Sequence, residues 1–248
     1  MDQDAEQQQT RPRRSRRVWK FVWKFLVFCL VFPIFQVAIL KFVDPPVTVM
    51  MIWQSMENIF SGDMPGFAFV NADRSQVAPS FYQAVVAAED QRFFTHNGFD
   101  FVELEKAQRA HARNPKRPMR GASTISQQVA KNLFLPPWRN IFRKSIEAYY
   151  TIWIELLWSK ERILEVYGNI VELAPHVYGV EAGAEYHFKK EASKLTPQQS
   201  AQLAAVLPNP KRWIASKPTP YIQRRTQRIL RQMRGLPVEE DEDDDENE

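Results

Sequence analysis

Cysteine and glycine are scarce in this chain of 248 residues, which has one cysteine and eight glycines. The single cysteine, Cys29, cannot form an intramolecular disulfide, so a disulfide-stabilised fold is excluded. The sequence contains no internal repeat and no long Gly/Ser linker, and alternating strand patterns are scarce. These absences leave one mainly helical domain, and the chain is long enough to bury a core of its own.

Charge is divided unevenly along the chain. Residues 239–248 read EEDEDDDENE, with nine acids in ten positions. Removing those nine charges from the formal net charge of +4 leaves the rest of the chain at about +13. A basic body suits an anionic partner such as lipid head groups or a pyrophosphate. Residues 237–248 are expected to be a disordered acidic tail.

The N-terminal segment predicts a membrane anchor. Residues 11–17 read RPRRSRR, and an apolar stretch follows over residues 18–43. About 20 helical residues cross a hydrocarbon core of roughly 30 Å, and Lys20 and Lys24 can extend to the head groups. A cleaved signal peptide is the alternative, but no small-residue cleavage site follows the stretch. Basic residues before the span predict a cytoplasmic N-terminus, with the rest of the chain outside the cytoplasm.

The chain therefore divides into four parts. We expect a cytoplasmic basic tail at 1–17, a transmembrane anchor at 18–43, a catalytic domain at 44–236 and the acidic tail at 237–248.

Several helix starts can be located from capping residues. The pairs that fit a capping box are Ser80 with Gln83, Thr124 with Gln127, and Thr196 with Gln199. Further expected N-caps are Asn140, Ser159 and Thr219. Gly235 is placed to end the last helix. The spacing of apolar residues in 146–157 predicts a helix with one face against the core.

The first group of reactive side chains lies in residues 87–100, AAEDQRFFTHNGFD. Glu89 and Asp90 follow an apolar helical run, and adjacent helical residues point about 100° apart, so the two acids have different roles. At helical spacing, Glu89, Arg92 and Phe93 share a face. An acid beside a hydrophobic wall suits a general base, whereas the structural alternative is an ion pair at a helix end.

A polar helix follows in residues 121–135, GASTISQQVAKNLFL. Its side chains form two stripes at helical spacing that could bind sugar hydroxyls: Ser123, Gln127 and Lys131, and beside them Thr124, Gln128 and Asn132. Capping accounts for Thr124 and Gln127 alone, and the remaining polar face also fits a solvated surface.

A basic cluster follows in residues 139–148, RNIFRKSIEA, where Arg143, Lys144 and Glu147 lie on one helix face. As a structural feature, the pair of Arg143 and Glu147 is worth only a few tenths of a kcal/mol. As a functional feature, two adjacent cations near a helix N-terminus can hold a pyrophosphate. Residues 160–188, expected to be helix, bend and helix, and residues 201–213 are interpreted as scaffold.

These blocks together resemble the peptidoglycan glycosyltransferases, also called murein transglycosylases, with a lysozyme-like domain of glycosyltransferase family 51. The resemblance runs from about residue 46 to 233 and is closest to the monofunctional biosynthetic members. The first block fits the pattern E-D-x-x-F-x-x-H-x-G, the second fits G-x-S-T-x-x-Q-Q, and the third fits R-K-x-x-E. The matching residues are Glu89, Asp90, Phe93, His96 and Gly98, then Gly121, Ser123, Thr124, Gln127 and Gln128, then Arg143, Lys144 and Glu147.

The chain departs from the family pattern in the fourth block. The family usually has Leu where this chain has Gly168, Phe-Gly where it has residues 173–176 (Leu-Ala-Pro-His), and Gly where it has Lys189. A glycine inside a helix costs about 1 kcal/mol relative to alanine. These departures concern local stability rather than the reaction.

The resemblance implies a reaction in which the 4-hydroxyl of an acceptor lipid II attacks the donor sugar C1 with inversion and displaces undecaprenyl diphosphate. It implies that Glu89 is the base and that Glu147 orients the basic cluster or helps to protonate the leaving group. The implied substrate-binding residues are Ser123, Thr124, Gln127, Gln128, Lys131, Asn132, Arg143 and Lys144.

Other expectations concern ligands and location. The sequence requires no cofactor and has no metal motif such as H-E-x-x-H, although a divalent cation bound to substrate phosphates is compatible with it. The expected partners are lipid II, the growing glycan chain, the membrane and other cell-wall synthesis proteins, with no nucleic acid. The expected location is the inner membrane, with the catalytic domain periplasmic.

Two rival functions remain from the residues alone. A helical lysozyme-like site with one strong acid could cleave glycan instead of making it, but cleavage does not need the basic R-K-x-x-E cluster. A non-catalytic membrane scaffold of wall synthesis is the second rival, and the departures from the family pattern allow it.

Overall fold

The computed structural model describes residues 13–61, 66–115, 123–138 and 140–235. The predicted acidic tail and most of the predicted basic tail lie outside the described residues. The elements follow the order α1 (Arg13–Leu40), α2 (Val49–Ser61), β1 (Ala68–Phe69), η1 (Arg74–Gln76), α3 (Pro79–Glu89), α4 (Phe101–Arg113), α5 (Ile125–Phe134), α6 (Ile141–Leu157), α7 (Lys160–Ile170), β2 (Glu172–Ala174), β3 (Val177–Tyr178), α8 (Val180–Phe188), η2 (Ala192–Lys194), α9 (Pro197–Val206) and α10 (Pro220–Met233). The mainly helical class expected from the sequence is confirmed.

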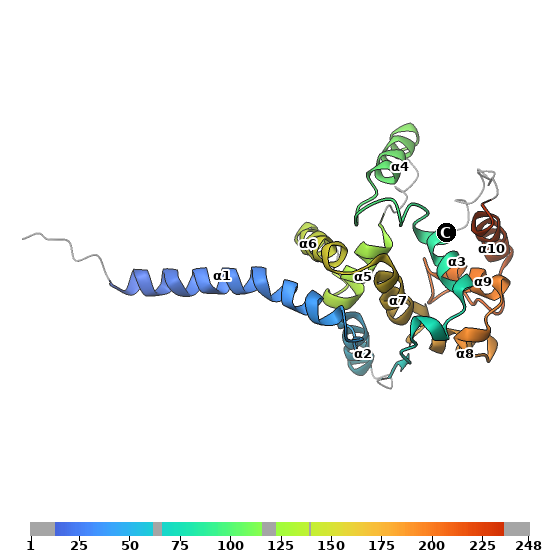
Figure 1. Ribbon diagram of the computed structural model, residues 1–248, viewed down its shortest axis with the longest axis horizontal. Coiled ribbons are helices and arrows are strands. Elements are labelled where there is room, and N and C mark those ends of the chain that lie inside the picture. The colour runs from blue at the N-terminus through green and yellow to red at the C-terminus, as the bar shows by residue number, and fades with distance from the viewer. Residues whose placement is uncertain (1–12, 62–65, 116–122, 139, 236–248) are drawn as a thin grey trace, which may run out of the picture.

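Helix α1 projects from the rest of the domain as a long rod (Figure 1). Residues 18–40 of this helix are long and apolar enough to cross a membrane, judged by length and composition. Its C-terminal end packs on α6 and is held by polar contacts. The Trp158 indole N–H donates to the carbonyl of Val37 at 2.8 Å, and Arg162 donates to the carbonyl of Leu40 at 2.9 Å. Because these bonds satisfy backbone carbonyls near the helix end, α1 joins the domain at a defined position.

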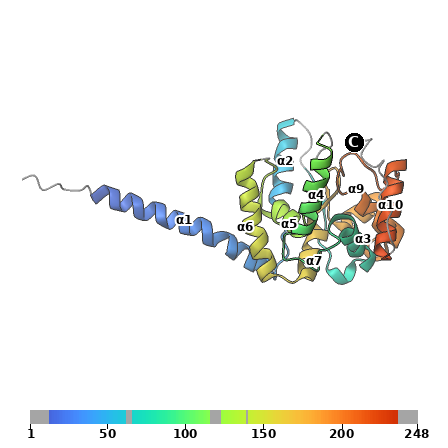
Figure 2. The same cartoon turned by 90° about the horizontal axis from the view of Figure 1, so that it is seen from above.

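The core lies where α5 packs against α6 and α7, and where α9 packs against α3 and α10. Figure 2 shows α3, α9 and α10 together at one end of the domain, and α2 and α6 at the other. The largest fully buried side chains include Phe81, Phe93, Tyr167 and Tyr178. Burial of such side chains on one face of each helix provides the main stabilisation.

Capping explains most helix starts. The capping boxes at Thr124 and Thr196 are confirmed, and Asn140, Ser159 and Thr219 each accept a backbone N–H at the start of their helices. The expected box at Ser80 is wrong. Helix α3 starts at Pro79 with Ala78 as N-cap, and the Ser80 hydroxyl instead lies 2.8 Å from the Ser200 hydroxyl. Proline at the first helical position fixes the start two residues earlier.

The segment 160–188 contains more than the expected helix, bend and helix. Strands β2 and β3 form an antiparallel pair between α7 and α8, and β1 adds to β3 in parallel. These strands have two or three residues each, too few for an alternating pattern to be recognised in the sequence.

The structure bears on all three departures from the family pattern. His176 and Lys189 both have positive φ, at 61° and 55°, a region where glycine is the least strained residue. At Gly168, an added Cβ would lie 3.1 Å from Cε1 of Tyr82. The Tyr82 ring therefore occupies the space that a leucine side chain at position 168 would need.

Candidate active site

Glu89 is the last residue of α3, and its carboxylate faces α5 and α10. The side-chain amide of Gln128 donates to Oε2 of Glu89 at 2.8 Å, and Nη2 of Arg225 lies 3.6 Å from Oε1. The Glu89 side chain is 15% exposed. A carboxylate held by one hydrogen bond and one ion pair, and still open to solvent, is well placed to accept a proton from a bound hydroxyl.

The expected helical face of Glu89, Arg92 and Phe93 is wrong, because α3 ends at Glu89. Asp90 has φ −160° and ψ 74°, which takes the chain out of the helix. Phe93 is fully buried in the core, and Nε of Arg92 instead lies 3.1 Å from Oδ2 of Asp100. The bend leaves Glu89 at a helix end rather than along a helix face.

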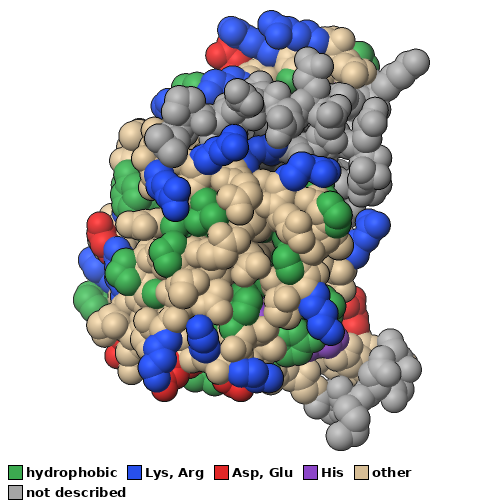
Figure 3. Space-filling view, turned by 90° about the vertical axis from the view of Figure 1, so that its right-hand side faces the viewer, with side chains coloured by type: hydrophobic (Ala, Val, Ile, Leu, Met, Phe, Trp, Pro, Cys, Tyr) green, Lys and Arg blue, Asp and Glu red, His purple; other side chains and the backbone are tan. Residues whose placement is uncertain are grey.

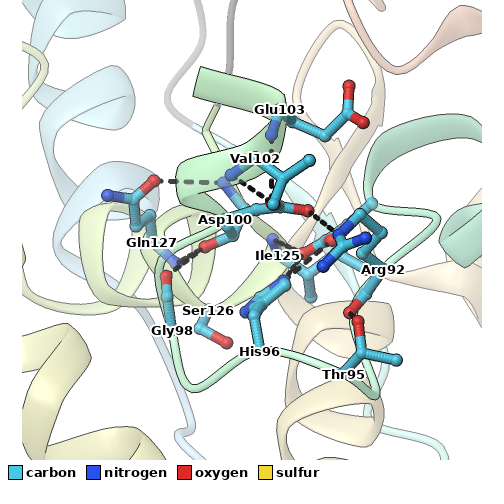
Figure 4. Close-up of polar contacts among 12 residues, drawn as sticks. Arg92, Thr95, His96, Gly98, Asp100, Val102, Glu103, Ile125, Ser126 and Gln127 are labelled. Atoms are coloured by element: carbon cyan, nitrogen blue, oxygen red, sulfur yellow. Dashed lines mark hydrogen bonds and ion pairs between the residues drawn. The ribbon is translucent and has the colours of Figure 1, made fainter. Parts of the chain in front are cut away.

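Asp90 is the centre of a buried polar network that connects the end of α3 to the start of α5. Its carboxylate accepts from the backbone N–H of Ile125 at 3.1 Å and lies 2.9 Å from Nε2 of His96. Burial raises the pKa of Asp90, and the hydrogen bond with His96 opposes this increase. Figure 4 shows His96, Ile125 and Asp100 close together around this bend. Asp90 thus shapes the backbone, whereas Glu89 points to the site, which agrees with the separate roles expected for the two acids.

Asp90, His96 and Asp100 also place one potential ligand atom each within 4.8 Å of one another. Their lone pairs are largely engaged. Asp100 Oδ1 accepts two backbone N–H groups at the start of α4, at 3.0 Å each, and its Oδ2 faces the Arg92 guanidinium. A cation beside a guanidinium would be repelled, so these residues fit a hydrogen-bonded bend better than a metal site.

Helix α5 carries the polar residues predicted to bind sugar. Thr124 is buried, and its hydroxyl caps the helix and donates to the carbonyl of Gly98 at 2.7 Å. Ser126 donates to Glu155 on the interior side of α5. Gln128 is the link to Glu89, and its carbonyl oxygen accepts from the Tyr167 hydroxyl at 3.3 Å.

The basic cluster lies at the start of α6, where Asn140 caps the helix by accepting the backbone N–H of Arg143 at 2.7 Å. Glu147 is 2% exposed and pairs with both cations, with Nη1 of Arg143 at 2.8 Å and with the Lys144 amine. Two cations share this one acid, so the cluster keeps a net positive charge. Nε of Arg143 is buried without a hydrogen-bond partner among the described residues.

Burial lowers the pKa of Lys131, and the nearby cation Arg143 acts in the same direction, whereas Glu147 and Glu89 oppose it. Lys131 is half-buried on α5. Both Glu89 and Glu147 therefore act electrostatically on the Lys131 amine.

A cavity of about 340 Å³ joins these groups. It is lined by Met50, Ser123, Gln127, Gln128, Lys131, Pro137, Trp138, Arg143, Lys144 and Glu147. Seven of the ten predicted site residues therefore line one cavity. The other three, Glu89, Thr124 and Asn132, do not line it. Glu89 is connected to the cavity through its hydrogen bond with Gln128.

Sequence reasoning missed four residues of the site, namely Met50, Pro137, Trp138 and Arg225. Trp138 and Met50 form its apolar wall, and the Trp138 ring packs edge-on against Trp53 at 5.8 Å. The dipeptide Pro136-Pro137 before this tryptophan is a turn signal that could have indicated a fixed loop. Arg225 belongs to α10, and no local pattern connects it with Glu89.

Comparison with known proteins gives one consistent result. Residues 68–234 match the family described as Transglycosylase. The chain is 46% identical over 227 residues to the "Biosynthetic peptidoglycan transglycosylase" of Xanthomonas campestris pv. campestris strain B100, covering 91% of each chain. It is 41% identical to the protein of the same name from Bacteroides thetaiotaomicron, over 92% of this chain and 91% of that one. The protein of that name from Bdellovibrio bacteriovorus is 43% identical, with 88% and 86% covered. The chain belongs to the transglycosylase family.

Proposed function

We propose that this protein polymerises lipid II into β-1,4-linked glycan strands. The observation that supports this best is the arrangement along α5, which links an acid, Glu89, to a cation-lined cavity through Gln128 and Lys131. Glycan polymerisation from a lipid pyrophosphate needs a base for the attacking hydroxyl and cations for the leaving group, and both are present here.

In the proposed reaction, Glu89 accepts the proton of the acceptor 4-hydroxyl as that oxygen bonds to C1 of the donor. The bond from C1 to the pyrophosphate oxygen breaks, and undecaprenyl diphosphate leaves with the electron pair. Lys131, Arg143 and Lys144, which line the cavity, stabilise the pyrophosphate charge. Glu147 orients the two cations of α6.

Sugar binding is assigned to Ser123 and Gln127 of the cavity wall, whereas Gln128, which also lines the cavity, positions Glu89. Thr124 and Asn132 act indirectly, since neither lines the cavity. A divalent cation, where one takes part, would bind through substrate phosphates rather than through a dedicated protein site. Helix α1 would hold the cavity at the inner membrane with the domain on the periplasmic side, which suits a lipid substrate.

The test is polymerisation of labelled lipid II by the purified full chain in detergent, beside Glu89→Gln and the control Glu185→Gln, an exposed acid on α8. We expect long glycan from the unmodified chain and the control, and at least a hundredfold loss for Glu89→Gln. Shortening of preformed glycan would indicate the cleaving enzyme instead. Lipid II binding without any product would indicate the scaffold.

A further inference from the structure

The C-terminal part of the chain carries a second basic surface, separate from the active site. Residues 192–238 contain no Asp or Glu but nine Lys or Arg. The next ten residues, 239–248, contain nine acids. A strongly basic stretch is thus followed directly by a strongly acidic one, and neither is used by the proposed reaction apart from Arg225.

Three basic residues of α10 line a groove of about 660 Å³ between α9 and α10. The groove is lined by Gln198, Gln202, Pro218, Pro220, Gln223, Arg224, Thr226, Gln227, Arg228 and Arg231. Arg224 and Arg231 are exposed, and their guanidinium groups have no acidic partner among the described residues. Figure 3 faces this end of the molecule and shows more Lys and Arg than Asp and Glu side chains.

The elements that pack most closely on α10 are α9 and α3. Helix α9 contains no acid, and the acid of α3, Glu89, pairs with Arg225. Arg225 does not line the groove. Helices α3 and α9 therefore supply no acid to Arg224 and Arg231, the two exposed cations of the groove.

The chain end lies within reach of the groove. Helix α10 ends at Met233, and the first acid of the tail is Glu239. A helix of 14 residues is about 21 Å long, while ten extended residues span up to roughly 35 Å. A segment tethered this closely has an effective concentration near the millimolar range at the groove.

We propose that residues 239–248 bind in cis along the groove between α9 and α10. Single exposed ion pairs are worth about 1 kcal/mol or less, so binding depends on many simultaneous pairs and weakens as salt rises. In both Figure 1 and Figure 2, α10 lies at the end of the domain remote from α1. This position favours the tail over head groups of the anchoring membrane as the occupant.

The test uses a fluorescein-labelled peptide of residues 237–248, measured by anisotropy against two detergent-solubilised proteins, the full chain and the chain ending at Val238. We expect salt-sensitive binding to the shortened chain and at least tenfold weaker binding to the full chain, whose own tail competes. In the shortened chain, Arg224→Glu with Arg231→Glu should weaken binding at least tenfold. The control pair, Lys211→Glu with Arg212→Glu, lies in the same acid-free stretch outside the groove and should change binding less than threefold.

Each alternative occupant has a distinct result. Equal peptide affinity for the full and shortened chains would overturn the proposal, as would an equal effect of the control pair. Displacement of the peptide by phosphatidylglycerol vesicles, but not by phosphatidylcholine vesicles, from the full chain would assign the groove to anionic lipid. A full chain that dimerises and becomes monomeric on shortening would assign the tail to a second copy. Polymerisation activity of each variant verifies that it is folded.

Discussion

Gln128 holds the carboxylate of Glu89 through its side-chain amide, with Nε2 2.8 Å from Oε2. On the other side, the hydroxyl of Tyr167 donates to Oε1 of Gln128 at 3.3 Å. Tyr167 is fully buried, so this contact fixes which way the amide faces. The position of the proposed base therefore depends on a residue of α5 and on a core tyrosine of α7.

Replacing Gln128 by leucine removes the donor to Glu89 at similar side-chain volume. A hydrogen bond to a charged group is worth about 1.5–3 kcal/mol, so we expect kcat for polymerisation to fall by about tenfold or more. KM for lipid II should change little if Gln128 acts through Glu89. Steady-state kinetics measure kcat and KM separately, and Gln198→Leu on α9 is the control. A raised KM at unchanged kcat would instead show that Gln128 mainly contacts substrate.

Lys131 should limit activity at alkaline pH. Burial lowers its pKa from the ordinary 10.5, and an amine loses its charge as pH rises through its pKa. The cation facing the pyrophosphate is thus lost at a lower pH than for an exposed lysine. Lys131→Arg keeps its charge at these pH values, so the alkaline loss of activity should move to higher pH. Initial rates measured from about pH 7 to 11 test this.

Lys131→Met is the second variant for this residue and should be weakly active at every pH, because it never carries the charge. An alkaline loss that is unchanged in Lys131→Arg would remove Lys131 as its cause.

The sequence predicted the parts of the site that depend on neighbours in the chain. Caps such as Asn140 and the spacing of Arg143, Lys144 and Glu147 are local, and the structure has them as expected. The contact of Glu89 with Arg225 could not be predicted, because it depends on how α3 packs against α10. The end of α3 at Glu89 was missed because the buried partners of Asp90 come from later segments.

The departure from the family pattern at Gly168 also depends on a side chain that is distant in the sequence. Its neighbour is Tyr82 on α3, with Cε1 3.1 Å from the position of an added Cβ. Gly168→Leu restores the residue usual in the family, but we expect it to destabilise the protein by about 1–3 kcal/mol through overpacking. Better helix propensity, about 1 kcal/mol, offsets only part of this loss.

A double-mutant cycle with Tyr82→Ala measures whether Tyr82 is the cause. Tyr82→Ala alone opens a cavity and should cost several kcal/mol, roughly 3–5. If the leucine fills that space, the double variant should be more stable than the sum of the single effects predicts, by about 0.5–3 kcal/mol. Denaturant unfolding in detergent gives these values. Additive effects would indicate that another neighbour, such as Phe81, resists the leucine.

Lys189 offers a stabilising substitution. It ends α8 with φ 55° and ψ 44°, a left-handed conformation that costs a side-chain-bearing residue about 1 kcal/mol or more. Its amine lies 3.9 Å from Glu185, and both side chains are largely exposed, so this pair adds little. Lys189→Gly should therefore stabilise the protein by about 0.5–1 kcal/mol, because the relief of strain exceeds the added freedom of the unfolded chain.

The adjacent lysine provides a matched control for this substitution. Lys190 is also exposed and does not have positive φ. Lys190→Gly therefore relieves no backbone strain and only adds conformational freedom to the unfolded chain. We expect the thermal midpoint to rise by a few degrees, about 1–4 °C, for Lys189→Gly and to fall slightly for Lys190→Gly. Midpoints measured at one scan rate in the same detergent compare them directly. If both variants shift in the same direction, charge removal rather than backbone conformation governs the stability of this helix end.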